Sequence, residues 1–415
     1  MVDNVIRKTT VSDSVVLRGT KKTVLALQHL IAMFGATVLV PILTGFNPSI
    51  ALFTAGAGTL IFHACSKGKV PAFLGSSFAF IPVILTIKEM YNGDLAYAQG
   101  GIFVAGLIYV ILALFIKKIG VARIRKLLPA TIVGPMIIVI GMSLIPTAYG
   151  MASENFMLAG VTLGTALLIN FKAKGFIKQL SILIAVLVGY ALALSLNLVN
   201  TETISQSQLI AIPPFQLPKF DMGAIAITAP VIIAVFMEHL GDITTNSQVV
   251  GKNFIEDPGL NRTLLGDGLA SMFAALVGGP ANTTYGENTG VLAITKNYDP
   301  SILRLAAIFA VALGFVAKIG GVLASIPNGV MGGISLILFS MISLIGVKTI
   351  KNEKVKFNFK NTLVMGTILV IGLGGFGIEI NESVSVAGLS FAAIVGITLN
   401  NVLTYIEKRF NKESN

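Results

Sequence analysis

Four side chains that can carry charge lie inside otherwise apolar sequence. They are Glu238, His239 and Asp242 in one stretch and Glu287 in another. Glu238 and Asp242 are four residues apart and share one face of a helix, whereas His239 points roughly 100° away from Glu238. A carboxylate at bilayer depth costs at least ~2.5 kcal/mol and usually marks a substrate or proton pathway. It accepts hydrogen bonds from ligand N–H groups when ionised, and holds a proton when desolvation favours the neutral form.

These properties predict a site in which Glu238 and Glu287 hold a ligand, while Asp242, Glu238 and His239 handle a coupling proton. The alternative is that Asp242 and His239 lie at the inner end of their helix and are merely solvated. His29 occupies a matching place near the start of the chain, where we expect a satisfied, buried histidine.

Composition indicates that the solvent around these residues is lipid. The chain of 415 residues is 54% hydrophobic, with a mean hydropathy of +0.84 and only 12% charged residues. Soluble domains carry about 25% charge. The net charge of +11 comes from basic residues in short gaps between apolar runs, which is typical of cytoplasmic loops and not of a nucleic-acid site. The single cysteine, Cys65, excludes an intrachain disulfide and a cysteine-cluster metal site, and we expect no cofactor.

The apolar runs predict an all-α membrane protein with fourteen transmembrane segments. A cytoplasmic amino terminus leaves only Lys88, Lys219 and Lys318 of the 30 Lys and Arg outside, so we expect both termini in the cytoplasm. Residues 1–23 then form a cytoplasmic segment and 406–415 a cytoplasmic tail. The predicted spans are 24–44, 50–66, 73–90, 99–116, 129–148, 155–171, 179–197, 222–240, 262–278, 282–296, 301–318, 326–346, 361–377 and 386–405.

Short motifs recur in the same order in both halves of the chain. The motif QHL at 28–30 returns as EHL at 238–240, and Pro71-Ala72 returns as Pro280-Ala281. Leu128-Pro129 likewise matches Ile326-Pro327. Two halves of seven spans would start on opposite sides of the membrane because seven is odd. The sequence therefore predicts two inverted seven-span repeats, the architecture of alternating-access transporters.

Segments 3 and 10 interrupt their apolar runs with turn-forming and polar residues, PAFLGSS at 71–77 and GPANTTYGEN at 279–288. Such backbone must be buried in protein or line a cavity, because lipid cannot satisfy its polar groups. We expect each to be an extended piece followed by a half-helix, capped by Ser76 or Ser77 in one and by Thr284 or a neighbour in the other. Helix amino termini at mid-membrane would then present free N–H groups. The alternative is a pair of proline-kinked helices with a purely structural role.

The motifs resemble those of the nucleobase:cation symporter-2 family, also called nucleobase-ascorbate transporters, and within it the bacterial uracil permease branch. The resemblance extends over nearly the whole chain. It is carried by QHLIAMFGATVLVP (28–41), PAFLGSSFAF (71–80), EHLGD (238–242) and NTTYGENTG (282–290).

The resemblance implies a core domain (24–116 and 222–318, spans 1–4 and 8–11) and a gate domain (129–197 and 326–405, spans 5–7 and 12–14), with dimerisation through the gate. By matching positions, Glu238 and Glu287 would bind the polar edge of a base, and Phe73 would stack on its ring. The backbone at Tyr285 and Gly286 would complete the pocket, and Phe339 would close over the substrate. Phe73 and Phe339 could instead be ordinary packing residues. The expected site residues are Phe73, Glu238, His239, Asp242, Tyr285, Gly286, Glu287 and Phe339.

We expect a proton-coupled secondary transporter in the cell membrane that imports a nucleobase, with uracil as the expected base. Glu287 followed by Asn288 favours uracil, because the family's xanthine and urate carriers often have Gln at that place. Asp242 departs from the pattern, since the best-known uracil symporter of the family has a histidine there and purine carriers often have Asp. A purine symporter of the same family and an anion exchanger or channel of the same fold are the alternatives. No nucleophile–base set is present in the sequence, so an enzyme is not expected.

Overall fold

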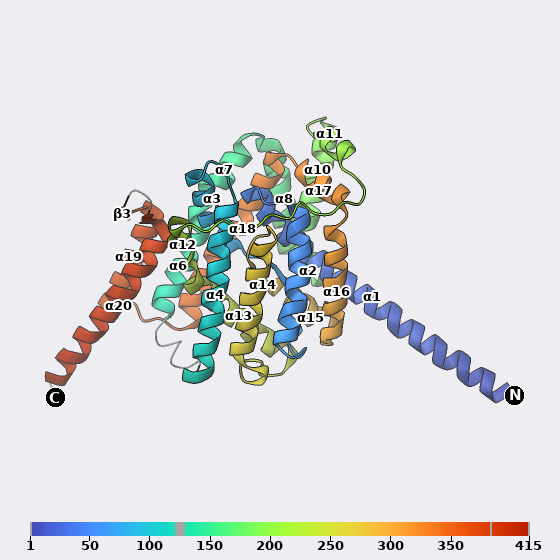
Figure 1. Cartoon of the computed structure of the whole chain (residues 1–415), viewed down its shortest axis with the longest axis horizontal. Helices are drawn as coiled ribbons and strands as arrows, with labels where there is room; N and C mark the ends of the chain where they lie inside the picture. The colour runs from blue at the N-terminus through green and yellow to red at the C-terminus, as the bar shows by residue number, and fades with distance from the viewer. Residues whose placement is uncertain (1, 121–128, 382–383, 414–415) are drawn as a thin grey trace.

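The computed structural model describes residues 2–120, 129–381 and 384–413. Leu128 of the predicted repeat, part of the basic loop between spans 4 and 5, and the last residues of the predicted tail lie outside the described residues. The described part is mostly helical, and its first and last helices project from opposite sides of the body (Figure 1).

The first half of the chain runs from α1 to α10. Its elements are α1 (Val2–Thr44), α2 (Pro48–Cys65), β1 (Leu74–Ser76), a 3-10 turn (Phe78–Phe80), α3 (Ile81–Met90), α4 (Ala96–Ile119), α6 (Ala130–Ser143), α7 (Ile145–Ser153), α8 (Phe156–Lys172), α9 (Gly175–Gln179) and α10 (Ser181–Ser195). A short helix, α11 (Thr201–Gln206), precedes residues 207–221, an extended segment that we call the outer strap.

The second half of the chain runs from α12 to α20. It comprises α12 (Met222–Thr228), α13 (Val231–Val250), a π-helical turn (Ile255–Gly259), α14 (Leu260–Leu276), β2 (Asn282–Thr284), α15 (Gly286–Thr295), α16 (Pro300–Gly314), α17 (Ala317–Ala324), α18 (Asn328–Asn352), α19 (Phe359–Gly374), β3 (Gly377–Asn381), β4 (Val384–Ala387) and α20 (Gly388–Glu413).

Only some of the predicted transmembrane spans correspond to helices long enough to cross a membrane. Seven of the described helices are long and apolar enough to cross a membrane, or eight if α16 and α17, bent by 77°, count as one span. The helices α8, α10 and α19 are apolar but shorter. The chain is therefore a multi-pass helical membrane protein, while the full set of fourteen spans remains a prediction.

Several predicted boundaries are wrong. The eighth span, predicted at 222–240, breaks at Ala229–Pro230 and continues to Val250. Glu238 and Asp242 consequently lie near the middle of the segment Met222–Val250 and not at its inner end. The antiparallel hairpin of β3, with five residues, and β4, with four, was not predicted. It is an exception to the predicted all-α fold. The helices α1 and α20 extend beyond the predicted first and last spans, to Val2 and Glu413.

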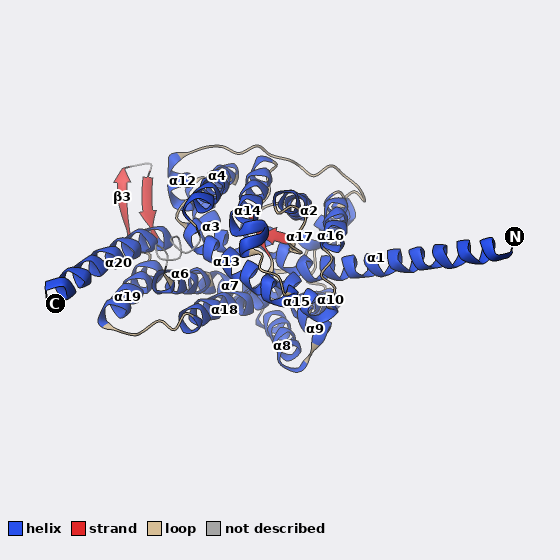
Figure 2. Cartoon of the chain, turned by 90° about the horizontal axis from the view of Figure 1, so that it is seen from below, coloured by secondary structure: helices blue, strands red, loops and turns tan. Residues whose placement is uncertain are grey.

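Close helix packing surrounds the two interrupted segments. The helix α14 packs against α2 and α4, and α18 packs against α6, α7 and α8. Two glycines permit the contact of α14 with α4: a methyl group on Gly106 would lie 2.7 Å from the Gly268 carbonyl oxygen, and one on Gly268 2.9 Å from the Gly106 carbonyl oxygen. Small residues at such crossings let membrane helices approach closely. In Figure 2 a short strand lies in the middle of the bundle, among helices from both halves of the chain.

Candidate functional site

The two interrupted segments pair with each other. Strands β1 and β2 are antiparallel, with Leu74 opposite Thr284, Gly75 opposite Thr283 and Ser76 opposite Asn282. The ladder extends at both ends, because Ser77 N–H donates to the Ala281 carbonyl at 2.8 Å and Tyr285 N–H donates to the Phe73 carbonyl at 2.9 Å. Each segment thus supplies the backbone partners that lipid could not supply.

Half-helices follow both strands, as predicted from the sequence. The helices α3 and α15 are each 10 residues long. The predicted capping by Ser76, Ser77 or Thr284 is wrong, because neither the 3-10 turn before α3 nor α15 has a side-chain cap. Ser76 instead donates to the Thr37 carbonyl at 3.0 Å. The first turn of α15 therefore has no capping side chain, although the Glu287 carboxylate accepts from its own backbone N–H.

Side-chain hydrogen bonds hold the two strands of the ladder together and attach them to α2. The Tyr285 hydroxyl donates to the Ser76 carbonyl at 2.9 Å, and its ring lies across Gly75, where an added methyl group would be 2.3 Å from the ring. The Thr59 hydroxyl accepts from the Leu74 N–H at 2.9 Å, and the Asn282 amide donates to the Thr54 carbonyl at 2.9 Å. These contacts leave little freedom for the ladder to change shape.

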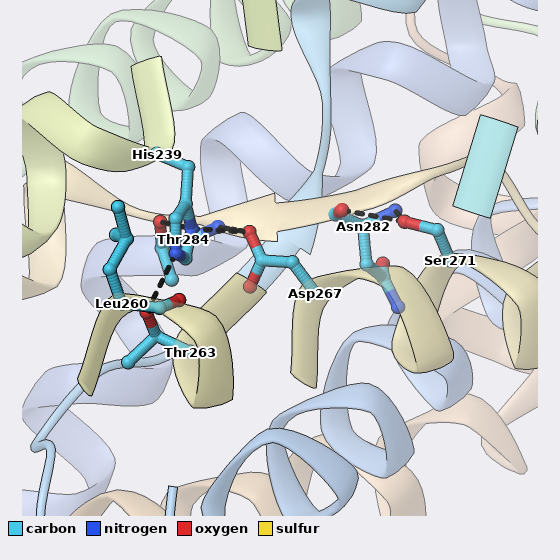
Figure 3. Close-up of polar contacts among 7 residues, drawn as sticks. All are labelled: His239, Leu260, Thr263, Asp267, Ser271, Asn282 and Thr284. Carbon is cyan, nitrogen blue, oxygen red and sulfur yellow. Dashed lines mark hydrogen bonds and ion pairs between the residues drawn. The ribbon is translucent and has the colours of Figure 1, made fainter. Parts of the chain in front are cut away.

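His239 and Asp267 form a fully buried pair beneath β2 (Figure 3). The distance from His239 Nδ1 to Asp267 Oδ2 is 2.8 Å, and both side chains have 0% exposure. The same carboxylate oxygen accepts from the Thr284 N–H at 3.3 Å, and the other ring nitrogen of His239 lies 3.0 Å from the Thr263 hydroxyl. This polar unit ties α13 and α14 to the strand that leads into α15. The alternative prediction that His239 is solvated is wrong.

Asp267 was not among the residues singled out from the sequence. It lies in the middle of α14, where Gly266 and Gly268 flank it. Its remaining oxygen, Oδ1, is buried with no hydrogen-bond partner among the described residues. An acidic residue inside an apolar span was the available signal, since such residues usually have a functional role.

Three carboxylates gather around the start of α15, and we call Glu238, Asp242 and Glu287 the carboxylate cluster. Glu238 interacts electrostatically with Glu287, and Asp242 interacts with both. The Thr284 hydroxyl hydrogen-bonds to Asp242. All three are half-buried, whereas Gly286 is exposed. The cluster therefore borders space that is open to a ligand.

Gly286 gives access to this space because it has no side chain. A methyl group there would lie 3.5 Å from Asp242 Oδ1. The predicted residues Glu238, Asp242, Gly286 and Glu287 are thus brought together by α13 and α15.

The two aromatic candidates lie deeper in the protein. Phe73 has 0% exposure and packs in the same apolar cluster as Tyr285, while its backbone takes part in the ladder. Phe339 is 1% exposed and belongs to a different apolar cluster, with Leu39 and Ile81. Among the described residues, no group of three or more metal-ligating side chains could hold a metal ion.

His29, in the first half of the chain, is buried and paired, as expected for a satisfied histidine. The Asn288 amide donates to the His29 carbonyl at 3.0 Å and lies 3.2 Å from His29 Nδ1. Asn288 follows Glu287 in α15, so this contact fixes the first turn of the half-helix against α1.

Comparison with known proteins identifies the family of this chain. A family model described as a permease family matches residues 20–379, which is most of the chain. The chain belongs to this family of permeases. The resemblance to the nucleobase:cation symporter-2 family is thereby confirmed.

Named relatives cover nearly the full length. The uracil permease of Bacillus caldolyticus is 44% identical over 395 residues, covering 91% of both chains. The uracil permease of Bacillus subtilis strain 168 is 40% identical over 399 residues, again covering 91% of both. That of Escherichia coli K12 is 38% identical over 395 residues, covering 92% of this chain and 91% of the relative. The relatives are permeases, so this chain is a transporter and not an enzyme.

Solved structures share the fold at low sequence identity. The transmembrane domain of the cyanobacterial bicarbonate transporter BicA aligns with a TM-score of 0.62 at 15% identity, covering 91% of this chain and 96% of that one. The murine anion transporter Slc26a9, in its inward-facing state, aligns with a TM-score of 0.69 at 11% identity, covering 93% of this chain and 68% of that one. These likenesses concern the fold alone.

Proposed function

We propose that this permease imports uracil together with protons. The observation that carries the proposal is the carboxylate cluster around the exposed Gly286, at the uncapped start of a half-helix. The relatives named uracil permeases support the choice of base.

The chemistry of the ring complements this arrangement. Uracil offers two N–H donors and two carbonyl acceptors. Glu238 and Glu287 would accept from the N–H groups, while the backbone N–H of Gly286 would donate to a carbonyl and the backbone at Tyr285 would complete the pocket. The positive end of the α15 dipole would add to that donation. Phe73 would stack on the ring and Phe339 would close over it from the gate domain, as the family resemblance implies.

Asp242 and Glu238 are the proposed proton carriers. They lie on one face of α13, and Asp242 interacts electrostatically with the other two members of the cluster. Placing three negative charges together is unfavourable, so one proton shared among them would relieve the repulsion and favour loading. His239 is a further candidate, because it connects the cluster's helix to Asp267.

Transport would follow alternating access between two domains. The proposed core consists of 24–116 and 222–318, and the proposed gate of 129–197 and 326–405. The antiparallel pairing of β1 with β2 supports an inverted repeat, since a two-fold axis in the membrane plane would relate two such strands in this way. We further propose that both termini are cytoplasmic and that two copies associate through the gate.

Uptake into proteoliposomes tests the proposal. We expect accumulation of labelled uracil when the outside is acidic, and loss of accumulation when an ionophore collapses the proton gradient. Unlabelled uracil should compete better than thymine, xanthine or adenine. Uptake that ignores the gradient would refute proton coupling, and preferred competition by xanthine would identify a purine carrier.

Matched variants distinguish loss of substrate binding from the general effect of removing a negative charge. Glu238→Gln and Glu287→Gln should each abolish most uptake while the protein still elutes as a folded species. Glu154→Gln removes an exposed carboxylate outside the cluster and should leave uptake unchanged. Equal uptake in all three variants would contradict the proposed binding roles.

Anion exchange is the second candidate, because two anion carriers share the fold. The three carboxylates argue against it, since they would repel an anion from the space beside Gly286. Bicarbonate or chloride flux by the same proteoliposomes, insensitive to uracil, would favour that candidate instead.

A further inference from the structure

An apolar groove lies apart from the carboxylate cluster. It has a volume of about 400 Å³ and is bounded by α1, α10, α17 and the start of α18. In the proposed domain scheme, α1 belongs to the core, whereas α10 and α18 belong to the gate. The groove therefore follows the seam between the two domains.

The walls of the groove come from aliphatic and aromatic side chains at regular helical spacing. Helix α1 contributes Phe34, Val38 and Ile42, and α10 contributes Val186 from the opposite side. Among the described lining residues, Lys318 is the only charged one. The Tyr190 hydroxyl is already bonded to the Ser325 hydroxyl at 2.7 Å, so it offers little to a polar ligand.

Water is a poor occupant of this space. A volume of this size would hold roughly a dozen waters at ~30 Å³ each, and each needs two to four polar partners that the walls lack. An empty space would forfeit the dispersion contacts of all its lining atoms. A flexible hydrocarbon chain satisfies both conditions.

The groove opens toward the surrounding medium. Leu187 and Leu209 on its rim are 57% and 69% exposed. The α1 face that lines it continues into Ile31 and Leu27, which are 38% and 41% exposed. In a membrane permease an open apolar surface on such helices faces lipid, so acyl chains have a continuous path into the groove.

Lys318 supplies the polar end of the site. Its ammonium group donates one hydrogen bond to the Ser207 carbonyl at 3.3 Å. An ammonium has three N–H donors, so two remain for a phosphate oxygen. The predicted topology places Lys318 on the outer side, where a lipid headgroup would lie.

We propose that this groove binds an anionic phospholipid, with one acyl chain between α1 and α10 and the phosphate at Lys318. Closely packed side chains resist sliding, whereas a fluid chain between two faces does not. The lipid would thus ease movement at the seam; this consequence rests on the proposed transport cycle, but lipid binding itself does not.

Tryptophan fluorescence offers a direct test because the chain contains no tryptophan. Ile319→Trp places a reporter on the α17 wall of the groove. Leu168→Trp, at a side chain 59% exposed on α8, reports contact with bulk lipid, and Phe236→Trp, at a side chain 0% exposed, reports the protein interior. Each variant is reconstituted in vesicles of phospholipid brominated on its acyl chains, which quench nearby tryptophan.

We expect quenching of Ile319→Trp close to that of Leu168→Trp and several-fold stronger than that of Phe236→Trp. Quenching no stronger than in Phe236→Trp would overturn the proposal, because protein would then shield the groove. Quenching by acrylamide but not by brominated lipid would indicate a water-filled space and also overturn it. Val186→Trp on the opposite wall replaces the reporter if Ile319→Trp does not fold.

The headgroup is tested with mixed vesicles in which only one lipid is brominated. Brominated phosphatidylglycerol should quench Ile319→Trp more strongly than brominated phosphatidylcholine at the same mole fraction, and adding Lys318→Gln should abolish the difference. Equal quenching by both lipids in the presence of Lys318 would refute the proposed preference for an anionic lipid, because both headgroups carry a phosphate and only phosphatidylglycerol has a net negative charge. Uracil uptake is not the readout, so failure here is distinct from failure of the proposed function.

Discussion

Removal of the Asp267 carboxylate should weaken the fold at the centre of the candidate site. Asp267 accepts from His239 at 2.8 Å and from the Thr284 N–H at 3.3 Å, and it is fully buried. The substitutions to compare are Asp267→Asn, which keeps the shape and one acceptor, and Asp267→Ala, which removes both contacts.

The structure sets the expected magnitudes. A hydrogen bond to a charged group contributes about 1.5–3 kcal/mol, so Asp267→Asn should lower the free energy of unfolding by roughly that amount. Asp267→Ala leaves His239 and the Thr284 N–H buried without a partner, and breaking a buried pair in this way costs about 3–5 kcal/mol. The exposed Glu89→Gln should stay within about 0.5 kcal/mol of the parent.

A double-mutant cycle with His239→Ala assigns the effect to the pair. Unfolding is followed in mixed micelles for Asp267→Ala, His239→Ala and the double variant. Residues in direct contact show coupling of about 0.5–3 kcal/mol, so the double variant should lose less stability than the sum of the single variants. Additive losses would refute the reasoning, because the buried contact would then contribute nothing of its own.

Two further predictions concern the ladder and the outer strap. Gly75→Ala should lower the free energy of unfolding by about 1–3 kcal/mol and reduce uracil uptake, because the new methyl group would overlap the Tyr285 ring. Gly150→Ala is the matched control for both measurements, because the space around Gly150 is open. A hydrogen bond from Lys219 of the strap, aided by a backbone N–H, lowers the pKa of Asp94 below its ordinary value. The contribution of this contact is therefore present at neutral pH and lost as pH falls below about 4. Amide hydrogen exchange in the outer strap, corrected for its intrinsic pH dependence, should therefore become faster in acid. The variant Asp94→Asn should show this faster exchange already at pH 7. Unchanged protection of the strap in both experiments would contradict the role of the ion pair.

The interrupted segments were predictable because their composition conflicts with the membrane. Pro71 and Gly279 begin stretches that lipid-facing backbone cannot accommodate, so extended pieces followed by half-helices were the natural interpretation. The pairing partner of each strand was not predictable, since it depends on how two segments some two hundred residues apart meet in space. The predicted helix caps were wrong for the same reason. The Ser76 hydroxyl donates to the Thr37 carbonyl in α1 and does not cap the half-helix that follows it.

Buried polar residues account for the other errors. Asn246 lies inside α13, beyond the predicted end of the eighth span, and donates to the Pro71 carbonyl at 2.9 Å. The predicted eighth span therefore ended too early. Asp267 was overlooked because hydropathy averaged over a window hides a single charge between glycines and aliphatic residues. In both cases the partner comes from a distant segment, which sequence periodicity does not reveal.

The ladder satisfies the backbone of both interrupted segments. An interrupted helix exposes backbone donors and acceptors along its whole unwound length, and β1 and β2 satisfy one another there. Neither half-helix start has a side-chain cap, and the carboxylate cluster gathers around the first turn of α15. Donors on one side and acceptors on the other suit a ligand that carries both, and a simple anion would meet the wrong charge on the cluster's side. The geometry thus favours a small polar ring over an anion, even though anion carriers share the fold.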